Sequence, residues 1–206
     1  MEVHFPHSQL ACWKCRAAPS DLPVCSRCGA VQDFPDGLSH YETLGLGPSL
    51  ALNEEELRNH YYALCRELHP DQHIDKESRQ SIYSLRWTTA INKAYQILRD
   101  PIQRSQYVLQ LHQVDTAQLK PALPFKLAET YLDLQSDGPM GKEIFEDFKK
   151  EMLAEIVKNE QQWDPIARQF DSGVDRPSVL RQLAQYMANQ KILSAMANDL
   201  NKRWKE

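Results

Sequence analysis

The stretch Asn53-Glu54-Glu55-Glu56-Leu57-Arg58-Asn59-His60-Tyr61-Tyr62-Ala63-Leu64-Cys65-Arg66-Glu67-Leu68-His69-Pro70-Asp71 decides the fold of this chain. Asn53 can cap a first helical turn, and Glu56 can reach back to it as in a capping box. The apolar residues that follow fall on one helical face: Leu57, Tyr61, Leu64, Cys65 and Leu68. Pro70 disfavours helical geometry at His69 and cannot itself continue the helix. The pattern therefore predicts a helix that ends at a corner exposing His69 beside Asp71.

A second helical pattern follows the loop 72–77, with apolar residues at steps of three or four: Tyr83, Trp87, Ile91, Ala94 and Leu98. Two antiparallel helices joined by a His-Pro-Asp loop, and preceded by the short segment 41–46, resemble the J-domain over about residues 39–112. The resemblance implies that His69, Pro70 and Asp71 engage a DnaK- or HscA-type chaperone ATPase, with Pro70 holding the shape of the loop. The residues alone leave open a plain solvated turn between two core helices.

One feature departs from the J-domain pattern. J-domains usually carry a basic face on the helix before the tripeptide, and here Arg58 and Arg66 would supply it. The same helix carries acidic side chains at Glu54, Glu55, Glu56 and Glu67, and Gln72-His73 stands where a lysine is common. We therefore expect weaker electrostatic steering toward the chaperone, or a specialised partner. Cys65 lies on the apolar stripe, so we expect a buried core thiol rather than a nucleophile.

A third helix is predicted from Asp100-Pro101, a cap followed by proline at the first helical position, to about His112. Together with the run 92–95, Arg104 and Tyr107, this stretch is similar to the HscB-type J-proteins of iron–sulfur cluster assembly. In that family a helical bundle follows the J-domain and binds the scaffold protein on which the cluster is built. The resemblance thus implies a co-chaperone that delivers this scaffold.

The rest of the chain fits such a bundle. After a polar, proline-marked connection, residues 125–135 form a short amphipathic pattern, followed by a long one with a possible kink at Asp164-Pro165 and a last one after 171–173. These patterns predict an antiparallel three-helix bundle over 122–206. The family's contact helix implies client-binding candidates in the first pattern, namely Leu127, Leu132 and Asp133. The same residues could instead belong to the core.

The N-terminal segment is organised by two Cys-x-x-Cys pairs, Cys12 with Cys15 and Cys25 with Cys28. Each pair can place two thiolates on one turn, and Gly29 lets the second turn fold back, so the four sulfurs predict a structural Zn²⁺ site. Iron in the same cage, or two disulfides in an oxidising compartment, are the alternatives. Four thiolates leave no open position for a catalytic zinc. We expect the side chains of Trp13 and Phe34 to pack beside the site.

The composition and charge of the chain limit which other functions and locations are plausible. A net charge of −4 and a pI near 6.0 argue against a general nucleic-acid partner, including a zinc-ribbon binder. No apolar run has membrane-spanning length, and the N-terminus shows no signal pattern, which predicts a cytoplasmic protein. A mitochondrial matrix protein that has lost its presequence is the alternative.

We therefore predict an all-α protein: a tetracysteine segment over 1–36, a J-domain with an extended last helix over 37–113, and a C-terminal bundle over 122–206. The predicted function is that of a co-chaperone and not of an enzyme. Two rivals remain: a J-protein with a client unrelated to iron–sulfur clusters, and an enzyme using His69 with Asp71 or the cysteines. The enzyme would need a third positioned group and an oxyanion donor, which no motif supplies.

Overall fold

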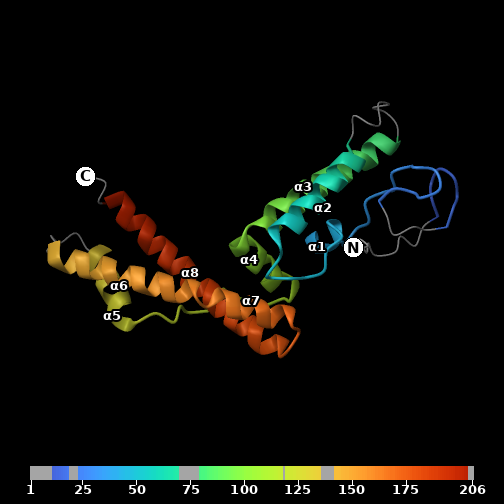
Figure 1. Cartoon of the computed structure of the whole chain (residues 1–206). Coiled ribbons are helices and arrows are strands. Elements are labelled where there is room, and N and C mark those ends of the chain that lie inside the picture. The colour runs from blue at the N-terminus through green and yellow to red at the C-terminus, as the bar shows by residue number, and fades with distance from the viewer. Residues whose placement is uncertain (1–10, 19–22, 70–78, 118, 136–141, 204–206) are drawn as a thin grey trace. The chain divides into compact units, whose positions relative to one another are not determined.

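The computed structural model describes residues 11–18, 23–69, 79–117, 119–135 and 142–203 (Figure 1). The all-α prediction is confirmed, since the only β pairing in the described ranges is an isolated bridge between Val24 and Val31. The helices are α1 (His40–Thr43), α2 (Glu54–Glu67), α3 (Arg79–Arg99), α4 (Pro101–Leu111), α5 (Phe125–Gln135), α6 (Lys142–Glu160), α7 (Trp163–Asp171) and α8 (Arg176–Arg203). Of these described helices, none combines the length and the apolar character needed to cross a membrane.

The chain divides into two compact units, residues 1–104 and 105–206, and each is described by itself. The division falls within α4, after its first turn. The three-part division into 1–36, 37–113 and 122–206 stays a prediction.

Helix α2 begins and ends as its sequence indicates. The Asn53 side chain accepts hydrogen bonds from the N–H groups of Glu55 (2.9 Å) and Glu56 (3.1 Å), so the predicted cap is present. The reciprocal pair of a capping box is found instead at the start of α1, where Ser39 and Glu42 each accept from the other's backbone. The helix stops at Leu68, directly before His69.

Helices α2 and α3 pack along the faces that their apolar spacing predicts. Leu57, Leu64 and Leu68 are buried on α2, and Trp87, Ile91, Ala94 and Leu98 are buried on α3. On the rim of this interface the ring of Tyr61 stacks on that of Tyr95 at 4.1 Å, and its hydroxyl donates to Asn92 (3.0 Å). Cys65, predicted to be a buried core thiol, is only half-buried beside Tyr61 at the rim of this interface. Burial still raises the pKa of its thiol, which disfavours the reactive thiolate.

Arg104 joins the start of α4 to the rest of the first unit. The cap that precedes it is confirmed, because the Asp100 carboxylate accepts from the N–H groups of Ile102 (2.8 Å) and Gln103 (2.9 Å). The Arg104 side chain is only 5% exposed, and its Nε donates to the carbonyl of Leu50 (3.0 Å). Its Nη1 donates to the carbonyl of Leu98 (2.5 Å), near the end of α3. One buried guanidinium thus ties α4 to α3 and to the segment before α2.

The second unit has a core built from α5, α6 and α8. Its buried side chains form one cluster: Leu127, Phe145, Phe148, Met152, Leu193, Met196 and Leu200. The apolar faces of the amphipathic patterns predicted for this part of the chain therefore form its core. On the edge of the cluster the Tyr131 hydroxyl of α5 donates to the Asp199 carboxylate of α8 (2.5 Å), which links the two helices.

The expectation of one long helix with a kink at Asp164-Pro165 is wrong, because the chain forms two helices there. α6 ends at Glu160 and α7 begins at Trp163. Proline removes one backbone donor, and its ring clashes with the carbonyl four residues earlier, which here belongs to Gln161. The Gln162 N–H donates to Asn159 (3.0 Å), a tightened last turn that ends α6. α7 then buries Ile166, Ala167 and Phe170 and packs on α8.

Replacing Arg104 with methionine tests the buried guanidinium. Methionine keeps much of the volume but leaves the carbonyls of Leu50 and Leu98 without this donor, so we expect the free energy of unfolding to fall by about 2–4 kcal/mol. Urea denaturation followed by circular dichroism measures the change. Arg168→Met, on an exposed 3.7 Å ion pair of α7, is the control and should cost under about 0.5 kcal/mol. Equal denaturation midpoints for the two variants would contradict this role.

Candidate functional site

The four cysteines lie on two turns with the same backbone pattern. In each turn the N–H of the first cysteine donates to the carbonyl five residues ahead, at 3.0 Å for Cys12 and 2.9 Å for Cys25. In each, the N–H four residues ahead donates back to the carbonyl of that cysteine, from Arg16 and from Gly29, both at 2.9 Å. These two donors have φ values of 58° and 69°. The left-handed residue closes each turn and brings its two sulfurs to one side.

The sulfur positions fit a single tetrahedral metal ion. The four Sγ atoms lie within 4.8 Å of one another. Cys12 and Cys28 are separated by 3.7 Å between sulfurs, and Cys15 and Cys25 by 3.8 Å. A tetrahedron with metal–sulfur bonds of about 2.3 Å has edges of about 3.8 Å. Disulfide-bonded sulfurs would be about 2.0 Å apart, so the four cysteines are unbonded thiols arranged as metal ligands.

The electrostatics of the cage favour a bound cation. Burial opposes ionisation of Cys12, yet the backbone N–H groups of Cys15 and Lys14 lower the pKa of its thiol to about 6. The Ala30 N–H favours the Cys28 thiolate, but burial and the adjacent sulfurs outweigh it and raise the pKa of that thiol to about 12. Protons must therefore leave the cage when a metal enters, and the metal charge replaces them.

Two residues of the cage escaped the sequence analysis. The Gln32 amide Nε2 donates to the Cys12 sulfur (3.4 Å) and to the carbonyl of Ala30 (2.6 Å). Arg16 occupies a left-handed position without being glycine. The only feature of the sequence that could have pointed to Gln32 is its position, four residues after the last cysteine. No feature of the sequence indicates that Arg16 adopts a left-handed conformation. Trp13 packs against the cysteine cluster as predicted, whereas Phe34 contacts the ring of Trp87 instead.

The predicted docking corner is described only at its helical edge. His69 is exposed and follows the last residue of α2, while Pro70 and Asp71 lie outside the described residues. Arg58 and Arg66 are both exposed on α2 and stand eight residues apart. Between them Tyr62, which the sequence analysis did not single out, exposes 56% of its surface. Steps of four place these three residues on one face of the helix.

The candidate client residues of α5 divide between core and surface. Leu127 is 1% exposed and belongs to the buried cluster of the second unit. Leu132 is 65% exposed, and Asp133 is exposed as well. Residues five apart on a helix point in different directions, so Leu127 and Leu132 cannot share one face. A partner could reach Leu132 and Asp133, but it could reach Leu127 only by opening the bundle.

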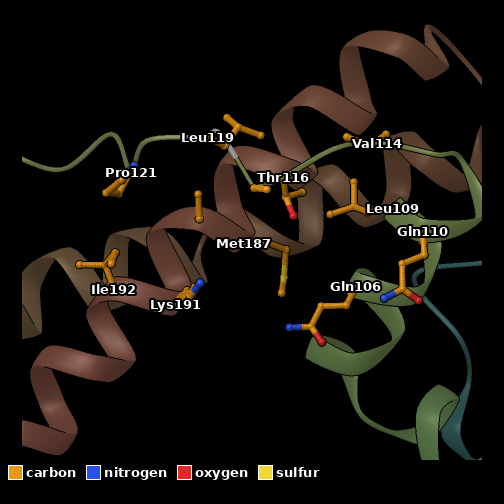
Figure 2. A pocket seen from close by; sticks show the side chains of 12 residues that line it. Gln106, Leu109, Gln110, Val114, Thr116, Leu119, Pro121, Met187, Lys191 and Ile192 are labelled. Atoms are coloured by element: carbon orange, nitrogen blue, oxygen red, sulfur yellow. The ribbon is translucent and has the colours of Figure 1, made fainter.

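The second unit also holds a pocket of about 400 Å³ between α4, the segment after it and α8 (Figure 2). Met187 points into the space between Gln106 and Lys191. Among the described residues that line this pocket, Lys191 alone carries an ionisable side chain.

Known proteins resemble this chain in sequence and in fold. Residues 39–107 match the DnaJ domain family. The "Co-chaperone protein HscB homolog" of Burkholderia thailandensis is 39% identical over 77 residues, which cover 37% of this chain and 44% of that protein. The protein of the same name from Paraburkholderia xenovorans is 28% identical over 153 residues, covering 70% of this chain and 86% of the relative.

Two solved structures share the fold. The crystal structure of human co-chaperone protein HscB superposes with a TM-score of 0.67 at 16% identity, covering 94% of this chain and 98% of that one. Chaperone HscB from Vibrio cholerae gives a TM-score of 0.53 at 18% identity, covering 81% of this chain and 99% of that one. At these identities the likeness concerns the fold alone.

The chain contains a J-domain, as the DnaJ match over residues 39–107 and the packing of α2 on α3 show, and His69 directly follows the end of α2. Beyond this domain, the chain resembles HscB co-chaperones in sequence and in fold. It also carries a tetracysteine cluster near its N-terminus.

Gly29→Ala tests the closing residue of the second turn. A Cβ at Gly29 would have no atom within 4 Å, so its cost arises only from the left-handed φ of +69°. We expect a loss of about 1 kcal/mol, measured as about fivefold weaker metal binding in competition with a chromophoric chelator. Gly47→Ala is the matched control, with equally open space and no left-handed φ. Equal metal affinity of both variants would show that the conformation of Gly29 does not matter.

Proposed function

We propose that this protein is a co-chaperone that stimulates the ATPase of a DnaK/HscA-type chaperone and delivers an iron–sulfur cluster scaffold protein to it. The observation that carries the proposal is the exposed His69 at the end of α2, within a matched DnaJ domain. The HscB names of the relatives support the choice of chaperone and client. ATP chemistry would belong to the partner, and this chain would act by binding.

In this mechanism the corner His69-Pro70-Asp71 contacts the chaperone and favours its hydrolysis-competent arrangement. Arg58, Tyr62 and Arg66 would extend the contact along one face of α2. The acidic residues Glu54, Glu55 and Glu56 lie in the first turn of α2, roughly 15 Å along the helix from Arg66. That distance exceeds the Debye length at physiological salt, so they weaken steering near the corner only slightly. Glu67, beside Arg66, remains the local opposing charge.

We propose Zn²⁺ as the metal of the tetracysteine cage, in a structural role. The donor set supports it: four thiolates at tetrahedral spacing suit zinc and leave no open coordination position. When bound, the ion would supply the folding energy of a segment too small to form a core of its own. Iron in the same cage remains the alternative, and metal analysis of the purified protein distinguishes the two.

For the client we propose a contact through the exposed side of α5. A partner can reach Leu132 and Asp133 there. Phe125, which is 80% exposed, lies seven residues before Leu132, about two helical turns, and so on the same face. Exposed apolar side chains on one helix face are typical of a protein-binding surface. Leu127 would support this helix from the core rather than touch the client.

His69→Gln tests the docking corner. Because His69 is exposed, we expect the substitution to abolish stimulation of the cognate chaperone ATPase while helicity and melting temperature stay unchanged. The assay is steady-state ATP hydrolysis by the chaperone at increasing concentrations of this protein, with and without the scaffold. Undiminished stimulation by the variant would remove the proposal.

Leu132→Ala tests the client surface against Leu127→Ala. The exposed truncation should weaken scaffold binding about tenfold, a common loss for a central apolar contact, with little change in stability. The buried truncation should cost about 2–5 kcal/mol of stability. Isothermal calorimetry with the scaffold and thermal melting separate the two effects. If the wild-type protein binds no scaffold yet stimulates the chaperone, the rival with another client is favoured.

A further inference from the structure

The cage segment is fastened to one side of the first turns of α3. The guanidinium of Arg79 lies 5.5 Å from the centre of the Trp13 ring, and Tyr83 meets the same ring edge-on at 6.2 Å. One turn further, Arg86 forms an ion pair with Asp33. Steps of four and three along α3 place Arg79, Tyr83 and Arg86 on one side of the helix.

Trp87 is the anchor of this attachment. Its side chain is 2% exposed although it lies near the start of α3. The ring of Phe34 meets its ring edge-on at 4.8 Å, and its indole N–H donates to the backbone carbonyl of Gln32 (3.0 Å). Segment 32–34 thus covers an aromatic side chain that would otherwise lose part of its burial.

The same residues also hold the sulfur cage. Gln32, whose carbonyl binds Trp87, donates its side chain to the sulfur of Cys12. Trp13 stands between Cys12 and Cys15, and its indole donates to the carbonyl of Val31 (2.8 Å). The contact with α3 and the ligand geometry therefore share two residues, Gln32 and Trp13.

The opposite side of these α3 turns holds the end of α2. The hydroxyl groups of Ser84 and Thr88 both donate to the carbonyl of Leu68, the residue directly before His69. Ser84 follows Tyr83 and Thr88 follows Trp87 in the sequence. The turns of α3 that contact the cage segment are therefore the same turns that contact Leu68. Contacts thus run from the Cys12 sulfur through Gln32 to Trp87, and Ser84 and Thr88 in the same turns of α3 contact the carbonyl of Leu68.

We infer that the metal cage braces the first turns of α3 and that metal loading thereby sets how tightly the protein docks on its chaperone. The docking part rests on the proposed function. Without the ion the cage segment cannot stay folded, because it is too small to bury a core. Trp87 then loses its cover, and the turns 83–88 that hold Leu68 loosen. Trp13, Gln32 and Phe34 act in this scheme as positioning residues.

The first test compares the full-length protein loaded with Zn²⁺ and stripped of it by a chelator under reducing conditions. Hydrogen exchange of the amides 83–88 should speed up in the stripped protein, while the amides of α8 are unchanged. The concentration giving half-maximal chaperone stimulation should rise about three- to tenfold, with a similar maximal rate. Unchanged exchange and unchanged half-maximal concentration would overturn the inference.

The second test removes one contact between the cage segment and α3 while keeping all four cysteines. Phe34→Ala should retain the metal yet speed exchange at 83–88 and raise the half-maximal concentration. Ile144→Ala, a truncation at a residue 53% exposed on α6, is the control and should change neither. If Phe34→Ala alters neither quantity with its metal still bound, the cage is not a brace.

If Phe34→Ala loses its metal, exchanging the charges of the Asp33–Arg86 ion pair tests the same contact. Asp33→Arg and Arg86→Asp should each weaken docking, by about twofold because both side chains are close to half-exposed. The double variant should restore the wild-type half-maximal concentration, and failure to restore it would count against the brace. If the wild-type protein stimulates no chaperone, the proposed function fails, and the exchange measurements still decide the brace.

Discussion

The carbonyl of Leu68 is the group on which the docking corner depends. The last carbonyls of any helix lack intrahelical donors, and Pro70, two residues after Leu68, has no N–H to contribute. Here Ser84 and Thr88 supply them from α3. The hydrogen bonds at the end of α2 thus also tie it to the second and third turns of α3. The exposure of His69 follows, because Leu68 is buried against α3 and the next residue must turn outward.

A similar constraint operates at the other end of the hairpin. There the carbonyls of Leu50 and Leu98 are satisfied by Arg104, which is buried although it carries a charge. Burying a guanidinium is costly unless its donors are used, so its position is narrowly determined. Both ends of the α2–α3 pair are therefore fixed by hydrogen bonds between side chains and carbonyls. Apolar packing holds the helices together, and these polar contacts set their register.

Local signals predicted most of the first unit and less of the second. The caps at Asn53 and Asp100 and the sulfur cage follow from residues within a few positions, so the sequence was sufficient. The break before α7 was missed because the effect of Pro165 falls four residues earlier, where nothing in the sequence looks unusual. Leu127 and Leu132 were chosen from the resemblance to the family's contact helix, although their spacing places one inside and one outside. The contacts of Trp87 with Gln32 and Phe34 join residues more than fifty positions apart, which no periodic pattern reveals.

In the proposed mechanism the cage and the corner have one physical property in common: both act through binding surfaces. Four thiolates occupy every position of a tetrahedral ion, so the metal can act only through the shape it imposes. Shape acts on a partner through differences in binding free energy, and such coupling is reciprocal. If metal loading tightens docking by some factor, docking must tighten metal binding by the same factor. Binding of the chaperone would then slow the loss of the ion from the cage. The metal would therefore be bound most tightly while the protein is docked on its chaperone.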